Sequence, residues 1–115
     1  MYSLQHMFRV QGAPSFLDTC ERIAYNALPA TITPDMWQHQ YLQQANEINA
    51  LYGIKDHVWQ TDGVDSTGFG VEPNFGCCTA NMQQGWPKLA NNVVLRKGAP
   101  AGDTPPTIAV AMLAP

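Results

Sequence analysis

The sequence carries little charge and contains no long apolar run. Charged residues make up 13% of the 115 positions, with 6 basic against 9 acidic side chains and a net charge of −3. A nucleic-acid partner requires basic residues against the phosphate backbone, so this composition argues against nucleic acid. A membrane-spanning helix needs a run of roughly 18 apolar residues, and none occurs, so we expect no membrane partner.

Cysteine is also scarce. A small domain held by disulfides carries an even set of cysteines, whereas this chain has 3, which favours reduced thiols. Cys77 and Cys78 are adjacent. Ordinary disulfide geometry requires Cα atoms at least about 4.4 Å apart with converging Cβ vectors, which neighbouring residues do not easily provide. We therefore expect both sulfurs to be free thiols or metal ligands.

The residues that are present suit one packed domain, because 45% of them are apolar. Apolar residues at helical spacing predict a helix over 2–10 that stops at Gly12, with Leu4, Met7 and Phe8 on one face. A second helix is predicted over 15–28. Its apolar stripe comprises Phe16, Cys20, Ile23, Ala24 and Ala27. This spacing predicts that Cys20 is a buried core thiol rather than a ligand.

The segment 36–48 is rich in glutamine and aromatic residues. Its alternation favours a short strand or hairpin edge over a helix. Such a cluster suits sugar binding, because amides hydrogen-bond hydroxyl groups and rings cover the apolar sugar face, although solvated surface explains it equally well. His39 and Gln40 are the candidate sugar-binding residues in this segment. The long loop that follows, over 52–76, is of a kind that often carries function.

The Cys77–Cys78 pair lies where this loop is expected to run into a helix, and we expect Thr79 to cap that helix. The first N–H groups of a helix favour negative charge, so the position predicts thiols of lowered pKa that serve as metal ligands or nucleophiles. Pro87 is expected to kink or restart the helix. Residues 96–106 then form a predicted linker, and 107–113 form a predicted strand without an obvious partner.

Three stretches of the chain carry a family resemblance. Residues 21–30 (ERIAYNALPA), 40–44 (QYLQQ) and 72–88 (EPNFGCCTANMQQGWPK) are similar in order and spacing to the β-L-arabinofuranosidase-like glycoside hydrolases of family 127. That resemblance implies a mainly α fold: the C-terminal part of an (α/α)6 barrel with an inserted β-hairpin, followed by the first strand of a β-sandwich. It would assign 1–95 to the barrel, 96–106 to a linker and 107–115 to the sandwich, as a fragment of a longer polypeptide.

The resemblance also implies a chemistry. In this family a zinc ion is held by an upstream Glu-x-Cys element and by two loop cysteines, the first of which attacks the anomeric carbon of a carbohydrate substrate. Cys77 matches the nucleophile and zinc ligand, and Cys78 matches its co-ligand. The upstream ligands and the catalytic acid are expected before residue 1, in the remainder of the parent polypeptide. Some members have Cys-Cys-Pro-Pro-Asn where this chain has CCTAN, which affects the expected choice of sugar.

Several residues keep two interpretations at this point. Glu72, five positions before Cys77, is a candidate substrate-site carboxylate or a loop-surface residue. His39 and His57 are candidate sugar contacts or ordinary packing and surface histidines. The alternative to a glycosidase fragment is a small, non-catalytic metal- or carbohydrate-binding module that uses the thiol pair structurally. A redox role is disfavoured, because the pair lacks the two-residue spacer of Cys-x-x-Cys motifs.

Overall fold

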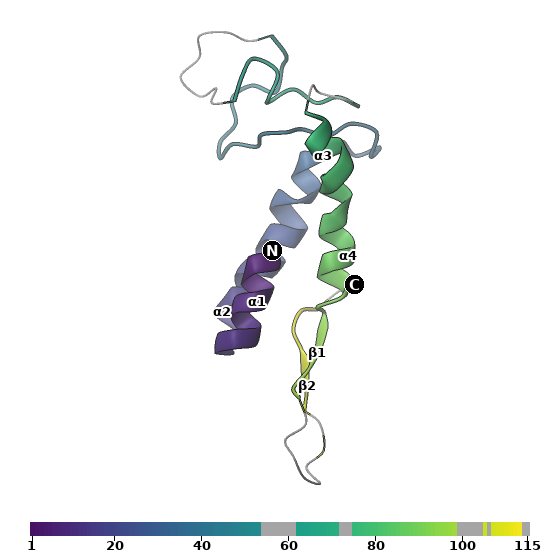
Figure 1. Ribbon diagram of the computed structural model, residues 1–115. Helices are drawn as coiled ribbons and strands as arrows, with labels where there is room; N and C mark the ends of the chain where they lie inside the picture. The colour runs from purple at the N-terminus through teal and green to yellow at the C-terminus, as the bar shows by residue number, and fades with distance from the viewer. Residues whose placement is uncertain (54–61, 72–74, 99–104, 106, 114–115) are drawn as a thin grey trace. The chain divides into compact units, whose positions relative to one another are not determined.

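The protein divides into two compact units. The computed structural model describes residues 1–53, 62–71, 75–98, 105 and 107–113. Unit 1 comprises Met1–Tyr25 with Gln84–Pro115, and unit 2 comprises Asn26–Gln83. The described elements are mainly helical, with one two-stranded antiparallel sheet (Figure 1). A mainly α architecture was expected, while its completion into an (α/α)6 barrel stays a prediction.

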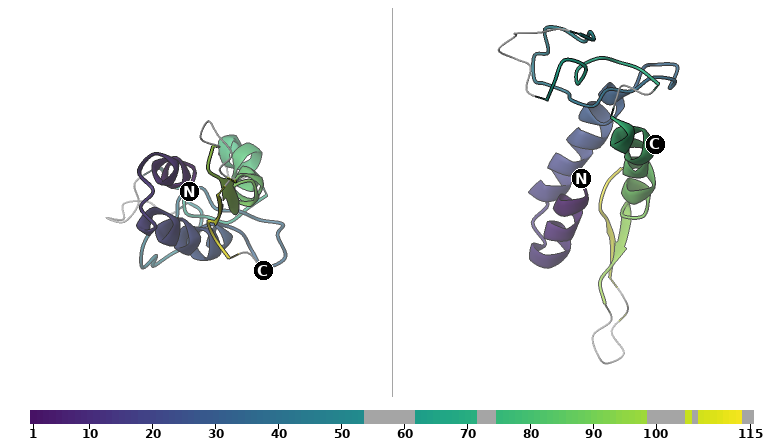
Figure 2. Two further views of the ribbon diagram at one scale, coloured as in Figure 1. Left: turned by 90° about the horizontal axis from the view of Figure 1, so that it is seen from below. Right: turned by 45° about the horizontal axis from the view of Figure 1, so that its top comes forward.

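Two helices open unit 1. α1 spans Tyr2–Gln11 and ends at Gly12, which adopts the left-handed conformation with φ 72°. This is the predicted stop, since glycine enters that conformation without a steric penalty. α2 spans Ser15–Arg22 and packs beside α1 (Figures 1 and 2). The predicted helix over 15–28 is confirmed in its extent, although its last part, Ile23–Ala27, widens into a π-helical turn before a 3-10 turn at Pro29–Thr31.

The apolar core of unit 1 is small. It consists of Cys20, Ala24, Leu89 and Met112, with Met1 and Leu4 packed against it. Cys20 is fully buried, as the helical spacing predicted, and burial raises the pKa of its thiol. The inward face of α1 differs from expectation: Met7 is 40% exposed, whereas Gln5 is buried with both polar side-chain atoms lacking a partner.

The C-terminal part of unit 1 is a helix followed by a hairpin. α4 spans Gly85–Ala90 and follows a 3-10 turn, η3, at Met82–Gln84. Pro87 lies in the first turn of α4, where the absent N–H costs no helical hydrogen bond, so the predicted restart is confirmed. Among the described residues, no helix has the length and apolar character needed to cross a membrane.

The hairpin supplies the partner that the sequence did not reveal. β1 (Val94–Arg96) pairs antiparallel with β2 (Ile108–Val110), with Leu95 opposite Ala109. The strand predicted over 107–113 is therefore confirmed over 108–110. Its assignment to a following β-sandwich stays a prediction, as does the 96–106 linker, much of which lies outside the described residues.

Two expectations for unit 2 are wrong. The segment 36–48 forms no regular strand; His39 makes only isolated bridges to Ile32 and Gly70. The positive φ angles of Met36 and Asn46 interrupt the extended backbone that a longer strand requires. The helix after the loop, α3, spans Gly76–Asn81. It therefore begins before Thr79, which lies inside it and cannot be its cap.

Candidate functional site

The vicinal cysteines lie at the start of α3 in unit 2. Cys77 is exposed and Cys78 is half-buried, and both are free thiols, as the odd cysteine count and their adjacency predicted. Their Sγ atoms lie 3.8 Å apart. The Asn81 side chain donates a hydrogen bond to the carbonyl of Cys77 at 2.7 Å, which ties the last residue of the helix to its first turn. Two sulfur atoms are thus held close together with one of them open to solvent.

The electrostatics of the pair differ from the sequence-based expectation. Burial, together with the hydrogen bond and the electrostatic repulsion from Cys77, raises the pKa of the Cys78 thiol to about 11. The predicted lowering of the pKa is therefore wrong for Cys78. The physical reason is that desolvation and the neighbouring sulfur of Cys77 both oppose a charge on Cys78. At neutral pH this thiol is protonated unless a cation compensates its charge.

The thiol pair has the geometry of half a zinc site. Zinc holds thiolates at about 2.3 Å in tetrahedral geometry, which places two sulfur ligands about 3.8 Å apart. The observed Sγ–Sγ separation of 3.8 Å matches that edge. Among the residues that the structure describes, no group of three or more His, Cys, Asp or Glu side chains is arranged to hold a metal. Cys77 and Cys78 therefore fit zinc as two ligands of a set, not as a complete site.

One short extended segment contacts α3 at two points. The His39 Nε2 and Thr79 Oγ1 atoms share a hydrogen bond of 2.9 Å. The Tyr41 ring stacks on Phe75, the residue that precedes α3, with ring centroids 3.9 Å apart and an interplanar angle of 11°. Side chains two positions apart in an extended segment point to the same side, which explains why both reach the helix. The glutamine-aromatic cluster is thus directly connected to the cysteine helix.

The two candidate sugar-binding residues of this segment are buried. His39 is 8% exposed and Gln40 is 3% exposed. The Gln40 Nε2 atom donates hydrogen bonds to Thr67 O at 2.6 Å and to Glu47 Oε1 at 2.8 Å. Each residue keeps one buried polar atom without a partner, Nδ1 of His39 and Oε1 of Gln40. In this structure His39 and Gln40 therefore stabilise the fold of unit 2.

Two further candidate residues stay predictions. Glu72 and His57 lie outside the described residues. Sequence reasoning also missed Thr79 and Phe75 as supports of the cysteine helix. The local pattern around Phe75 carries no signal for its stacking on Tyr41, because that contact joins positions more than 30 apart in the chain.

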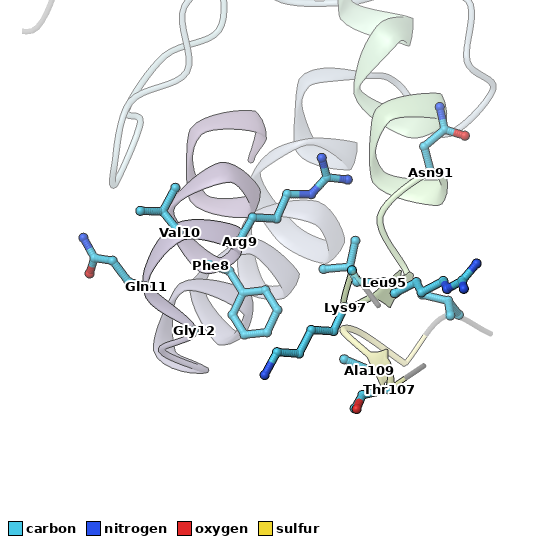
Figure 3. Close-up of a pocket in the computed structure, with 13 residues that line it drawn as sticks. Phe8, Arg9, Val10, Gln11, Gly12, Asn91, Leu95, Lys97, Thr107 and Ala109 are labelled. Atoms are coloured by element: carbon cyan, nitrogen blue, oxygen red, sulfur yellow. The ribbon is translucent and has the colours of Figure 1, made fainter. Parts of the chain in front are cut away.

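Unit 1 contains a groove that the sequence did not predict. It has a volume of about 870 Å³ and lies between the end of α1 and the β1–β2 hairpin (Figure 3). Its lining includes the apolar Phe8, Leu95 and Ala109 and the cationic Arg9, Arg96 and Lys97. Arg9 is held by a 2.6 Å hydrogen bond to Asn92 Oδ1. None of the candidate site residues lines this groove.

Comparison with known proteins identifies one family. Residues 1–91 match the family model described as beta-L-arabinofuranosidase, GH127 catalytic domain. The match includes α1, α2 and the whole of α3 with its two cysteines. No curated protein and no solved structure matches the chain.

Proposed function

The chain belongs to the GH127 family of β-L-arabinofuranosidase catalytic domains, and on this premise we propose that it forms part of a retaining glycoside hydrolase whose nucleophile is Cys77. The observation that carries the proposal is the exposed Cys77 thiol, held 3.8 Å from a second sulfur at the start of α3. The substrate is a carbohydrate with an arabinofuranosyl group. The remainder of a longer polypeptide supplies the rest of the site.

The reaction proceeds by two displacements at the anomeric carbon. The Cys77 thiolate attacks this carbon, the bond to the leaving oxygen breaks, and a carboxylic acid from elsewhere in the polypeptide gives that oxygen a proton. Water then attacks the same carbon, the carbon–sulfur bond breaks, and its electron pair returns to Cys77. The carboxylate accepts the proton from water. Two inversions at one carbon retain its configuration.

Zinc fits this role through Cys77 and Cys78. When bound, zinc keeps thiolate ligands deprotonated at neutral pH. The chain itself contributes the orientation: α3 presents Cys77 to solvent and keeps Cys78 half-buried beside it. The remaining ligands come from outside the described residues. We accordingly expect the isolated 115-residue chain to bind zinc weakly and to be inactive.

Contacts to the sugar stay a prediction for His39, Gln40 and Glu72. In the first two, His39 Nδ1 and Gln40 Oε1 have no hydrogen-bond partner, and both atoms are buried in this structure. A hydroxyl group of a sugar can donate to an amide oxygen and can either donate to or accept from an imidazole nitrogen. Glu72 is a candidate carboxylate close in sequence to Cys77.

The direct test is to trap the sugar on the nucleophile. The polypeptide encoded by the complete reading frame is mixed with 4-nitrophenyl β-L-arabinofuranoside, quenched in acid and digested for mass spectrometry. We expect one pentosyl group on the peptide that contains Cys77. Cys77→Ala should lose this label and lower turnover by about a thousandfold or more. Cys20→Ala, which removes a buried core thiol, is the matched control and should keep the label.

Three results would contradict the proposal. A pentosyl group on a residue other than Cys77 would assign the nucleophile elsewhere. Stoichiometric, tight zinc binding by the 115-residue chain alone would mean that the site is complete without other ligands, and it would favour a self-sufficient metal-binding module. An in-frame stop codon immediately upstream of the Met1 codon would likewise exclude zinc ligands from a preceding segment of the same polypeptide.

A further inference from the structure

The first turn of the cysteine helix α3 depends on contacts from other segments. α3 leads directly into the 3-10 turn η3, and its N-cap residue, Phe75, makes no side-chain cap hydrogen bond. The first N–H groups of a helix have no partner within the helix, so an uncapped first turn frays easily. The geometry of Cys77 and Cys78, which lie in that turn, therefore depends on contacts from outside the helix. In the described part of unit 2, these contacts include the hydrogen bond from His39 and the ring stacking from Tyr41.

We propose that His39 is a positioning residue for the thiol pair, and that it acts through the hydroxyl of Thr79. The inference rests on the proposed function for its catalytic consequence, since a displaced Cys77 cannot meet the anomeric carbon. Its geometric content is independent of catalysis. It assigns Nε2 of His39 to Thr79 on the helix, while Nδ1 is buried without a hydrogen-bond partner.

His39 is itself fixed by its backbone and by burial. Its backbone N–H donates to Gly70 O at 3.0 Å and its carbonyl accepts from Gly70 N at 3.1 Å. It also forms a bridge with Ile32, so the backbone of His39 is paired on both sides. The side chain is more than nine-tenths buried, which restricts the rotation of its ring. A fixed imidazole is a suitable anchor for a short helix.

The position of Thr79 on α3 links it to both cysteines. Thr79 follows Cys78 directly and is two residues after Cys77, so all three lie within one turn of α3. A hydrogen bond of 2.9 Å at Thr79 restricts both rotation and translation of that turn. The stacked Tyr41 and Phe75 rings restrict the chain just before it. Together the two contacts define where the Sγ atoms point.

His39 is better placed for this role than for direct contact with the thiols. Its Nε2 atom is already within hydrogen-bond distance of Thr79. Within the described residues, His39 does not join Cys77 and Cys78 in a group that could hold a metal. Loss of the His39–Thr79 hydrogen bond should therefore change the orientation of the Cys77 and Cys78 sulfur atoms without removing a metal ligand.

The test measures whether two sulfurs still converge on one atom. Phenylarsine oxide binds two thiolates through a single arsenic atom, and it requires neither zinc nor sugar. In the 115-residue chain, Thr79→Val removes the hydroxyl while keeping the shape of an exposed side chain. We expect it to weaken arsenical binding by about three- to tenfold, the range that corresponds to one hydrogen bond. Thr79→Ser keeps the hydroxyl and should retain the affinity.

Matched controls separate positioning from general helix weakening. Ala80→Val adds a β-branched residue to the neighbouring exposed position of the same helix and should change the affinity less than twofold. In a double-mutant cycle, His39→Phe should have little further effect once Thr79→Val is present. If His39→Phe fails to fold, the comparison of Thr79→Val, Thr79→Ser and Ala80→Val decides the matter without it.

Unchanged arsenical affinity in Thr79→Val, or an equal loss in Ala80→Val and Thr79→Ser, would overturn the inference. The failure of the proposed function is a separate result, because the absence of a pentosyl group on Cys77 leaves the arsenical comparison intact. Conversely, a pentosyl-labelled Cys77 together with an unaffected Thr79→Val would support the nucleophile and reject the role of His39.

Discussion

The two units bury different kinds of side chain. In the described residues, every buried apolar side chain belongs to unit 1, around Cys20 and Leu89. The buried side chains of unit 2 are instead polar: His39, Gln40, Ser66 and Thr67. Apolar burial is non-directional, whereas a buried polar group is stable only when its hydrogen bonds are made in the right geometry. Apolar burial therefore stabilises unit 1. In unit 2, directional hydrogen bonds hold the side chains around the cysteine helix in defined positions.

The comparison also explains where each unit is vulnerable. A core of packed methyl groups loses stability in proportion to the volume removed. A polar frame loses it when one partner disappears and the other is left buried and unpaired. Gln5 is the exception in unit 1, since its buried amide has no partner. The following predictions test this contrast.

The largest expected difference is in thiol accessibility. Iodoacetamide should modify Cys77 at least about a hundredfold faster than Cys20, because Cys20 reacts only when unit 1 opens, and opening costs several kcal/mol. Cys20 is fully buried and its thiol has a raised pKa, which slows its reaction further. Peptide mapping after timed quenching measures both rates. In denaturant the two rates should converge, and equal rates in the folded protein would contradict the buried core.

Removal of a core side chain should give the next largest effect. Leu89→Ala is expected to lower the free energy of unfolding by about 2–5 kcal/mol, through lost burial and the remaining cavity. Chemical denaturation followed by circular dichroism measures the change. Leu113→Ala is the matched control, because the Leu113 side chain is 79% exposed, and it should change stability by less than about 0.5 kcal/mol. Similar losses in both variants would argue against this core.

Removal of a polar partner in unit 2 should cost less. Gln40→Leu deletes the donor to Thr67 O and Glu47 Oε1 and leaves the buried carbonyl unsatisfied. We expect a loss of about 1–3 kcal/mol in the free energy of unfolding. Gln43→Leu is the same substitution at an exposed position and should be near neutral. A neutral or stabilised Gln40→Leu protein would show that unit 2 does not depend on its polar frame.

The smallest expected effect concerns a turn of unit 2. Hydrogen bonds from the Thr33 hydroxyl and the Trp37 N–H hold the pKa of Asp35 below its ordinary value of 3.8. A lowered pKa in the folded state stabilises the protein above pH 3.8, and the contribution is lost as the pH falls through the lowered value. Asp35→Asn should therefore reduce stability slightly at pH 6, and the difference should vanish below the lowered pKa. A difference that persists at low pH would assign the effect to another cause.

Local patterns predicted the helical part of the protein well. The apolar spacing of 15–28 and the glycine after α1 are sufficient to define both helices, because these signals act within one or two turns. Cys20 was placed in the core on the same basis. The face of α1 was predicted less well: Gln5 is buried and Met7 is not. Which residues of a helix turn inward depends on the element that packs against it.

Long-range contacts explain the remaining errors. The strand expected over 36–48 failed because Met36 and Asn46 adopt positive φ, so that only bridges form at His39. Residues 107–113 had no visible partner, because pairing with Val94–Arg96 joins segments separated by a connection of more than ten residues. The lowered pKa expected for Cys78 was wrong, because desolvation depends on the packing around the sulfur and not on the sequence next to it.

The sequence by itself determined the helices, the presence of two adjacent cysteines, Cys77 and Cys78, and the family to which the chain belongs. These properties depend on residue identity and on spacing along the chain. Only the tertiary structure decided how Cys77 and Cys78 are supported, because His39 and Thr79 are 40 positions apart and meet only when unit 2 folds. The physical reason is that hydrogen bonds and desolvation act over a few ångströms in space, whatever the distance along the sequence.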